Sequence, residues 1–401
     1  MTEQRRGTPD FLLLLLTFLL VGFGLVMVFS ASSVTALAKE KFGNDPLYFV
    51  KKQAIFAVAG TVGMFFLMNI PYRRLKPLLR PGFIVVLVML VLVPFIGFEV
   101  NGARSWFNLP GGMGSLQPSE FAKVGVILYL SLLISKKGER FRDLKNGLLP
   151  AVIIVGIVAG LIMLQPDFGS TMILVLAASL VIVVGGANLK HIFLAVGSIT
   201  VIAAIFLAGY LISADSLGYR MDRIACYLDP WFDQQSSCYQ LVQSLYAFGH
   251  GELTGAGFGQ SIQKMHYLPE AHNDFIFAII GEEFGFIGTV LFLLLYLAFL
   301  WRGFIVALRC TDLFGSLAGT GIVGLIAIQA LINMGGVTGT IPMTGVTLPF
   351  ISAGGSSLSV TMASIGILLS ISRDITKPDR AEKPEKRTGF ARDRNDWSKR
   401  A

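Results

Sequence analysis

The chain has 401 residues, of which 54% are hydrophobic and only 14% are charged, and its mean hydropathy is +0.68. A soluble domain of this size does not need so much apolar sequence, whereas a protein that crosses a membrane many times does. The formal net charge of +8 does not indicate nucleic-acid binding, because the basic residues lie in short segments between apolar runs. Composition therefore predicts an all-α polytopic membrane protein with no nucleic-acid partner.

Apolar runs of the length that spans a bilayer, about 17–25 residues, occur ten times along the chain. The first run follows Arg5 and Arg6 and contains no small-residue cleavage site, which predicts a retained helix rather than a signal peptide. The ten predicted spans lie near 11–33, 50–69, 81–98, 116–135, 147–164, 169–186, 190–212, 273–300, 315–336 and 350–372.

Charge distribution predicts the orientation of these spans. If the N-terminus is cytoplasmic, the segments on the inner side carry 24 of the 33 lysine and arginine residues, as the positive-inside rule requires. The predicted organisation is a cytoplasmic N-terminus over 1–10, a ten-helix membrane domain over 11–372 and a basic cytoplasmic tail over 373–401. The tail lacks apolar periodicity, so we expect it to be disordered or to lie along anionic lipid head groups.

One predicted outer connection, residues 213–272 between the seventh and eighth spans, is far longer than the others. Loops of this length are usually functional or disordered, and the aromatic content of this one predicts packed structure. Residues 240–249 fit an amphipathic helix on the membrane face, followed by a glycine-rich turn over 251–259. Cys226 and Cys238 both fall in this loop and could form a disulfide, whereas Cys310 is predicted to be a thiol on the inner side.

Polar residues gather at the outer ends of the predicted helices in four stretches. The most prominent runs from Leu268 to Glu283 and places Asp274 where the eighth span begins, with Glu282 and Glu283 deeper in that span. Ionisable groups at membrane depth are costly and usually functional. We expect Asp274 to take part in chemistry, and Glu282 and Glu283 to fix helix packing.

The other three stretches are 101–123, 165–170 and 335–359. Glu120 and Lys123 in the first of these are spaced i, i+3 and can form an ion pair, which is either purely structural or part of a site. Asp167 lies in a tight turn and either caps the next helix or serves the site. The glycines around Ser356 suit helix packing as well as a ligand groove.

Together these residues predict a cavity that opens to the outer face of the membrane. Its cations suit a phosphate or pyrophosphate group, and a buried carboxylate can take a proton from a hydroxyl. The histidines of the long loop lack the compact spacing of a zinc site. The predicted lining residues are Lys52, Arg104, Glu120, Lys123, Asp167, Arg223 and Asp274.

The same stretches resemble the SEDS (shape, elongation, division and sporulation) family, the FtsW/RodA/SpoVE group. Its motifs are matched in order by NGARSW at 101–106, QPSEFAK at 117–123, QPDFGS at 165–170, LPE and DFIFA within 268–278, EEFG at 282–285, and LPFIS and GGSS within 348–357. Two departures are His272-Asn273, where many relatives have His-Thr or Gln-Thr, and Ser352-Ala353-Gly354, where Ser-Tyr-Gly is common. Neither departure removes a candidate reacting group.

The resemblance implies a peptidoglycan glycosyltransferase that polymerises lipid II at the outer face of the bacterial cytoplasmic membrane. By that analogy, Asp274 is the general base that deprotonates the 4-hydroxyl of the acceptor N-acetylglucosamine. The oxygen attacks the anomeric carbon of the donor and expels undecaprenyl pyrophosphate with inversion. Four cations would hold the pyrophosphate: Lys52, Arg104, Lys123 and Arg223. Glu120 and Asp167 would orient these cations or a divalent ion (Mg²⁺ or Mn²⁺). Ser356 is also assigned to substrate binding.

The resemblance also implies partners and leaves two other functions open. A class B penicillin-binding protein would bind the long outer loop and cross-link the glycan, alongside other division or elongation proteins and membrane lipids. The division branch fits better than the elongation branch, and a sporulation role is the alternative. A lipid II flippase would need a polar path to both faces, whereas the charged residues cluster toward the outer half. A non-catalytic scaffold that recruits a transpeptidase would not need Asp274.

Overall fold

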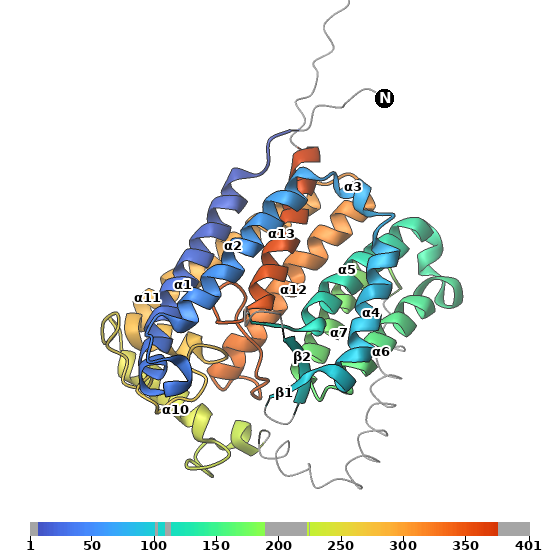
Figure 1. Ribbon diagram of the computed structural model, residues 1–401. Coiled ribbons are helices and arrows are strands. Elements are labelled where there is room, and N and C mark those ends of the chain that lie inside the picture. The colour runs from blue at the N-terminus through green and yellow to red at the C-terminus, as the bar shows by residue number, and fades with distance from the viewer. Residues whose placement is uncertain (1–6, 101–102, 109–113, 189–222, 224, 376–401) are drawn as a thin grey trace, which may run out of the picture.

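The computed structural model describes residues 7–100, 103–108, 114–188, 223 and 225–375. Its long helices form two groups that meet at a central helix (Figure 1). α12 is that helix, because it packs against α11 on one side and against α5 and α7 on the other. The first group comprises α1 (Phe11–Ala38), α2 (Tyr48–Asn69), α11 (Ile276–Leu308), α12 (Leu313–Val337) and α13 (Ser356–Ile375), and the second comprises α4 (Leu79–Ile96), α5 (Pro118–Lys137), α6 (Leu149–Met163) and α7 (Phe168–Val184).

Eight helices of the described chain are long and apolar enough to cross a membrane. They are α1, α2, α4, α5, α6 together with the short helix that precedes it (Leu144–Met163 in all), α11, α12 and α13, and each overlaps a predicted span. α7 is apolar but has only 17 residues, and the predicted span 190–212 lies outside the described residues. The last helix begins at Ser356 rather than near 350, because the chain before it, which contains Pro342 and Pro349, is irregular. The total of ten spans stays a prediction.

Both ends of the described chain leave the bundle together. The Gly7 amide donates a hydrogen bond of 3.0 Å to the Arg373 carbonyl, as an even number of spans requires. α10 (Tyr239–Gly251) and the loop around it lie at the opposite end (Figure 1). That this end faces outward stays a prediction, and the basic tail beyond residue 375 lies outside the described residues.

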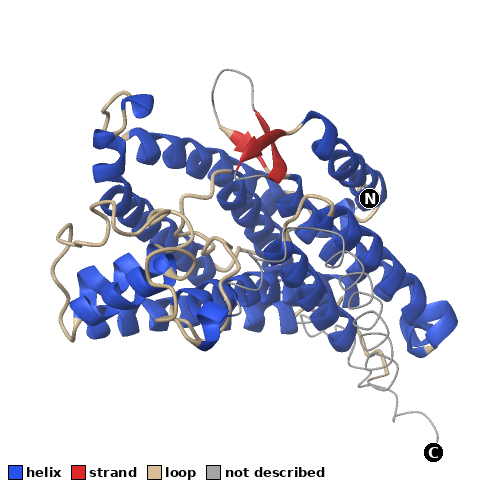
Figure 2. Ribbon diagram, turned by 90° about the horizontal axis from the view of Figure 1, so that it is seen from below, coloured by secondary structure: helices blue, strands red, loops and turns tan. Residues whose placement is uncertain are grey.

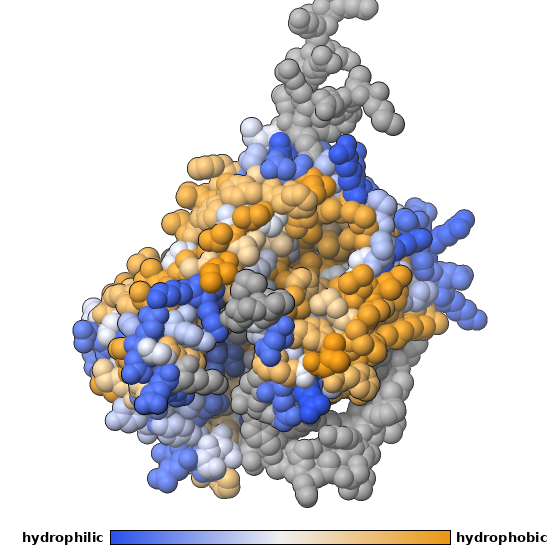
Figure 3. Space-filling model, in the orientation of Figure 1, coloured by the Kyte–Doolittle hydropathy of each residue, from blue (hydrophilic) through white to orange (hydrophobic). Residues whose placement is uncertain are grey.

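The surface of the bundle carries the apolar side chains that a lipid-facing surface needs. Figure 3 shows a broad hydrophobic area over the helices, with hydrophilic residues gathered near the two ends of the molecule. Large side chains such as Val62, Phe66 and Phe95 are 64%, 65% and 76% exposed. Helices that are apolar on their outer as well as their inner faces are expected of membrane spans rather than of a soluble bundle.

The described chain is mostly helical, as predicted, and one small sheet was not predicted. β1 (Phe98–Val100), β2 (Ala103–Asn108) and β3 (Ser115–Leu116) form a small antiparallel sheet in the order β1-β2-β3 (Figure 2). The pairing places Glu99 opposite Arg104. β1 and β3 have only three and two residues, and β2, with the sequence ARSWFN, does not alternate apolar and polar side chains, so the alternation typical of a strand could not be recognised.

One expectation for the long loop is confirmed, and one possibility that the sequence left open is realised. The predicted helix over 240–249 is α10, which packs against α11 and α12, and turns follow it over 252–259. Cys226 and Cys238 form a disulfide, whereas Cys310 is a buried free thiol. The described part of the loop is therefore packed onto the bundle.

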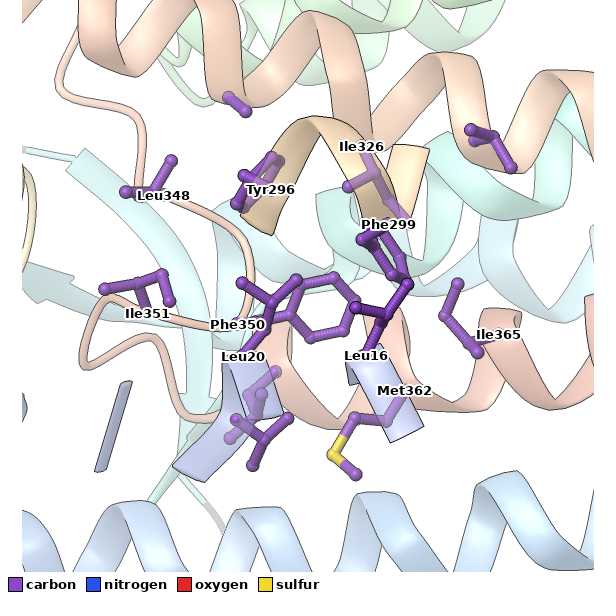
Figure 4. Packing of buried hydrophobic residues seen from close by; sticks show 14 of the residues in the cluster. Leu16, Leu20, Tyr296, Phe299, Ile326, Leu348, Phe350, Ile351, Met362 and Ile365 are labelled. Atoms are coloured by element: carbon purple, nitrogen blue, oxygen red, sulfur yellow. The ribbon is translucent and has the colours of Figure 1, made fainter. Parts of the chain in front are cut away.

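The irregular segment before α13 is anchored by one aromatic side chain. Phe350 projects among Leu16 and Leu20 of α1, Tyr296 and Phe299 of α11, and Met362 and Ile365 of α13 (Figure 4). Its ring lies 5.2 Å from that of Phe299 at an interplanar angle of 79°, the edge-to-face arrangement that aromatic pairs favour. Because Gly24 has no side chain, α1 can approach the Phe350 carbonyl; a Cβ at Gly24 would lie 2.2 Å from that oxygen.

Candidate active site

Asp274 lies in the turn before α11, two residues ahead of Ile276, and its side chain lines a cavity of about 50 Å³. Arg223, Glu270 and Asn333 line the same cavity. The backbone at Gly345 closes one side, where a Cβ would lie 3.5 Å from Asp274 Oδ2. A volume of this size holds a few water molecules or one end of a ligand, but not a whole sugar.

The surroundings of Asp274 favour its neutral form. Burial raises the pKa of Asp274 to about 7, and the negative charges of Glu270 and Asp167 act in the same direction, whereas Arg223 opposes them. A carboxyl group with a pKa near neutrality can accept a proton from a substrate and later release it to solvent. Sequence alone placed Asp274 and Arg223 in one site, and the structure places both on one cavity.

The turn that carries Asp274 is held from two sides. Asn333 on α12 donates from Nδ2 to the carbonyl of Asp274 at 2.7 Å and to that of Val346 at 2.6 Å. Ser352 Oγ donates to the Asn273 carbonyl at 2.7 Å, and the Ala353 amide donates to the His272 carbonyl at 3.0 Å. These bonds fix the position of Asp274 relative to α12 and the segment before α13.

A second, larger cavity of about 390 Å³ lies beside the same turn. It is lined by Lys39 and Phe49 from the α1–α2 region and by residues 268–273 of the turn, and Glu270 borders both cavities. The His272 ring lies 4.3 Å from that of Phe49, and burial lowers the pKa of His272. The turn therefore separates two spaces of very different size.

Glu120 and Lys123 form a buried ion pair within α5 that also contacts neighbouring helices. Lys123 Nζ lies 2.8 Å from Glu120 Oε1 and 3.1 Å from Gln329 Oε1 on α12, and only 1% of the Lys123 side chain is exposed. Ser357 at the start of α13 donates to Glu120 Oε2 at 3.2 Å. Because these contacts use the lysine and both glutamate oxygens, the pair serves to join α5, α12 and α13.

Gln117 bridges Asp167 and Ser356 where three helices begin. Asp167 is the N-cap of α7 and accepts a hydrogen bond of 2.9 Å from the Ser170 amide. Gln117, the N-cap of α5, donates from Nε2 to Asp167 at 3.2 Å and from its backbone amide to Ser356 Oγ at 3.2 Å. The positive ends of the α5, α7 and α13 dipoles thus come together here, which favours a negative charge.

Two predicted cations lie apart from the cavity around Asp274. Lys52, on the second turn of α2, places Nζ 4.5 Å from the centre of the Tyr48 ring. Arg104, on β2, is 54% exposed and lies 3.4 Å from Glu99. Among the described residues neither lines the cavity. Of the four predicted cations, only Arg223 lines it; its Nη1 also donates to the Met343 carbonyl at 3.1 Å.

The acidic residues do not present a ready set of metal ligands. No group of three or more His, Cys, Asp or Glu side chains in the described chain is placed to hold an ion. Glu120 uses one oxygen on Lys123 and the other on Ser357, and Asp167 already caps α7. These residues therefore do not fit the divalent ion that the resemblance implied.

The helix that follows Asp274 is broken at Gly285, where φ is +63° and ψ is −167°. The glycine-rich turn after α10 pairs with the backbone groups that the break frees. The Ala256 and Gly257 amides donate to the carbonyls of Glu282 and Glu283 at 2.9 and 3.1 Å. Irregular backbone at membrane depth is tolerated where the protein satisfies it in this way.

The side chains of Glu282 and Glu283 hold the same turn. Glu282 accepts hydrogen bonds from Ser261, from the Ile262 amide at 2.8 Å and from His250 at 2.9 Å. Glu283 pairs with Lys264, which places Nζ 2.8 Å from Glu283 Oε1. The expectation that both glutamates fix packing is therefore confirmed.

Sequence reasoning missed Lys264, Gln329 and Asn333. Gln329 and Asn333 are four residues apart within an apolar predicted span, so they share one face of the helix. Polar side chains on one face of a membrane helix are a recognisable signal for a buried contact. Lys264 gave no such signal, because it stands alone in a polar loop.

The fold and the site define a class of protein: a multi-pass membrane protein with a carboxyl group of raised pKa in a cavity beside its helix bundle. A family model described as "Cell cycle protein", the FtsW/RodA/SpoVE family, matches residues 11–377. The chain belongs to this family.

Individual relatives and solved structures are similar to nearly the whole chain. The "Stage V sporulation protein E" of Bacillus subtilis is 44% identical over 371 residues, covering 92% of this chain and 98% of the relative. The "Probable peptidoglycan glycosyltransferase FtsW" of the same organism is 41% identical over 393 residues, covering 96% of each.

Two solved structures show the same fold. One, from a structure titled "Structural coordination of polymerization and crosslinking by a peptidoglycan synthase complex", has a TM-score of 0.74 at 29% identity and covers 92% of this chain and 98% of that one. The rod shape determining protein RodA of Thermus thermophilus has a TM-score of 0.65 at 29% identity, again covering 92% and 98%.

Proposed function

We propose that this protein is a peptidoglycan glycosyltransferase that polymerises lipid II, with Asp274 as its general base. The names of several relatives support the activity. The observation that supports the residue is that Asp274 lines a cavity with Arg223 and that burial raises its pKa to about 7. A base with this pKa is largely ionised just above neutrality and still basic enough to remove a hydroxyl proton in the transition state.

In the proposed reaction the acceptor places its 4-hydroxyl in the small cavity. The Asp274 carboxylate takes the hydroxyl proton as the oxygen forms a bond to the anomeric carbon of the donor. The bond from that carbon to the pyrophosphate oxygen breaks, its electron pair leaves with undecaprenyl pyrophosphate, and the configuration inverts. Asp274 then returns its proton to solvent.

The cavity has space for a reacting hydroxyl but not for two disaccharides, so the bodies of the substrates lie outside it. Arg223 is the cation best placed to act on charge that develops near Asp274. Lys52 and Arg104 stay candidates for more distant parts of the pyrophosphate or its lipid. We assign Glu120, Lys123, Asp167 and Ser356 to holding the helices that surround the site, because each is used in the contacts described above.

The cellular setting belongs to the same proposal. We place the site at the outer face of the cytoplasmic membrane, where lipid II would be polymerised during division or shape maintenance. A class B penicillin-binding protein is the proposed partner, supported by the likeness to a chain of a peptidoglycan synthase complex. The packed loop around α10 is the surface that we propose for this contact.

The test is polymerisation of labelled lipid II by the purified protein with a class B partner present. Asp274→Asn keeps the size of the side chain and removes the base, so we expect a loss of at least about 10²-fold. Asp229→Asn, which changes an exposed carboxylate of the same loop, is the matched control and should stay active. Moenomycin excludes contaminating polymerases of the other class.

Each outcome assigns the function differently. Chains from the wild type and the control, but not from Asp274→Asn, support the proposal. Chains from Asp274→Asn as well would move the base to another carboxylate. If the wild type makes no chains with a competent partner, transport of lipid II or a scaffolding role becomes the better hypothesis.

A further inference from the structure

Gln329 and Asn333 lie one turn apart on α12 and make parallel contacts. Gln329 Nε2 donates to the Thr347 carbonyl at 3.1 Å, and Asn333 Nδ2 donates to the Val346 carbonyl at 2.6 Å. Each side chain therefore uses its amide hydrogens to hold the segment before α13. Both side chains are buried, with relative exposures of 3% and 4%.

The two residues differ in what their carbonyl oxygens do. Gln329 Oε1 accepts a hydrogen bond of 3.1 Å from Lys123. Asn333 Oδ1 is buried and has no hydrogen-bond partner in the described part of the chain. The orientation of the Asn333 amide is not ambiguous, because both of its partners are backbone carbonyls and only the nitrogen can donate to them.

Unpaired acceptors of this kind are uncommon in native proteins, because burying one without a partner is unfavourable. Seven buried side-chain atoms in the described chain lack a partner, and Asn333 is the one residue among them that lines the cavity with Asp274. Asn333 also donates to the Asp274 carbonyl. The unpaired oxygen therefore belongs to a side chain that lines the same cavity as Asp274 and is bonded to the Asp274 backbone.

We propose that Asn333 is a substrate-binding residue whose side-chain oxygen accepts a hydrogen bond from a hydroxyl of the acceptor sugar next to the one that reacts. This inference rests on the proposed function. On the acceptor N-acetylglucosamine, the neighbours of the 4-hydroxyl are the 3-hydroxyl and the 6-hydroxyl. A sugar that presents its 4-hydroxyl to Asp274 brings one of these neighbours toward Asn333, and the bond orients the nucleophile.

The test combines changes in the protein with changes in the acceptor. The kcat/KM of polymerisation is measured for wild type and Asn333→Ala with lipid II and with its 3-deoxy and 6-deoxy analogues as acceptors. One hydrogen bond between neutral groups corresponds to about a twofold to tenfold change. With the wild type, we expect kcat/KM to be lower by this factor for one analogue than for lipid II. With Asn333→Ala, kcat/KM should be the same for that analogue as for lipid II, because the variant already lacks the contact.

Gln329→Ala is the matched control, because it also loses a buried amide donor to the segment before α13. The Gln329 carbonyl oxygen is already paired with Lys123. Each analogue should therefore lower kcat/KM by the same factor with Gln329→Ala as with the wild type. If Asn333→Ala does not fold, Asn333→Ser replaces it, because a serine hydroxyl ends one atom short of the amide oxygen. The melting temperature of each variant reports folding separately from binding.

If each analogue lowers kcat/KM by the same factor with Asn333→Ala as with the wild type, the inference is overturned. Asn333 then has a structural role only. The same assay contains wild type and Asp274→Asn with unmodified lipid II. If the wild type polymerises and Asp274→Asn does not, the proposed function stands whatever the analogues show. If that comparison fails, the proposed function fails before Asn333 is considered.

Discussion

Lys264 Nζ lies 2.8 Å from Glu283 Oε1, and both side chains are almost fully buried. Ser30 on α1 completes the contact, because its hydroxyl is 2.5 Å from the same glutamate oxygen and 3.0 Å from the lysine nitrogen. The pair therefore joins the loop that follows α10 to two helices of the bundle. The loop continues from Lys264 to Asp274, so this anchor lies ten residues before the proposed base.

We expect Lys264→Met to be strongly destabilising. Removing one partner of a buried ion pair leaves an uncompensated charge, at a typical cost of about 3–5 kcal/mol. Lys264→Met combined with Glu283→Met should recover part of the loss, because neither charge is then left alone. Thermal unfolding in detergent measures both effects. Equal stability of the single and the double variant would contradict the prediction.

Lys51 and Asp45 provide the matched control for that experiment. Their ion pair is just as short, at 2.6 Å, but the two side chains are 63% and 34% exposed. Exposed pairs contribute only about 0–1 kcal/mol. Lys51→Met should therefore change the melting temperature little, so a large effect at Lys264 would report burial rather than the loss of a lysine.

Gly285→Ala should prevent the glycine-rich turn from docking on α11. The residue has a positive φ, and an added Cβ would lie 2.3 Å from the Gly255 nitrogen and 2.7 Å from the Gly251 carbonyl oxygen. Both strain and overlap oppose the change, and we expect a loss of about 2 kcal/mol or more. Gly249→Ala in α10 is the control, because a Cβ added there would point into open space, with no neighbouring atom within 4 Å.

The docking of this turn is measured by limited proteolysis of the loop as well as by thermal unfolding. Gly285→Ala should be cut faster between α10 and α11 than the wild type. Gly249→Ala should match the wild type or be slightly more stable, because alanine favours a helix more than glycine does. Unchanged cleavage of Gly285→Ala would show that the turn does not depend on the break in α11.

The pKa of Asp274 predicts how polymerisation depends on pH. A general base must be ionised, so kcat/KM should rise through pH 7 and level off above it. Glu270→Gln removes a negative charge that raises this pKa and should move the rise to lower pH. Arg223→Gln removes a positive charge that lowers it and should move the rise to higher pH. A flat profile between about pH 6 and 8 would argue against Asp274 as the base.

Stability should depend on pH in the opposite sense. Because the pKa of Asp274 is raised from 3.8 to about 7, the folded state prefers the protonated form. This contribution is fully present below pH 3.8 and is lost as the pH rises through 7. At pH 8, Asp274→Asn should therefore be more stable than the wild type, by at most about 4 kcal/mol. The difference should vanish near pH 4, which thermal unfolding at both pH values would show.

Much of the helical architecture follows from apolar length alone. The spans around α1, α5 and α12 were predicted within a few residues of their observed bounds, because a bilayer requires long continuous apolar segments. The small sheet and the break at Gly285 were not predicted. Both depend on contacts with distant parts of the chain, and a glycine within an apolar run does not by itself indicate a positive φ.

The candidate site was predictable in its residue types and in the possible Glu120–Lys123 pair, but not in which of these residues line the cavity. Asp274 and Arg223 were grouped from the sequence and do line one cavity. Lys123 was assigned to substrate, yet it is paired with Glu120 and Gln329. A lysine inside an apolar span needs a buried partner or a cavity, and the sequence cannot show which of the two it has.

The Cys226–Cys238 disulfide allows the stability of the loop to be tested separately from that of the helix bundle. The bridge closes a short segment, with a sequence separation of 12, and closing a loop of about 15 residues stabilises by about 3 kcal/mol in the chain-entropy model. Replacing both cysteines by serine should therefore lower the melting temperature and speed proteolysis of the loop. Cys310→Ser, at the buried free thiol, is the control and should leave loop proteolysis unchanged. Mass spectrometry after alkylation without reductant should find one labelled cysteine in the wild type, and three would show that the bridge does not form.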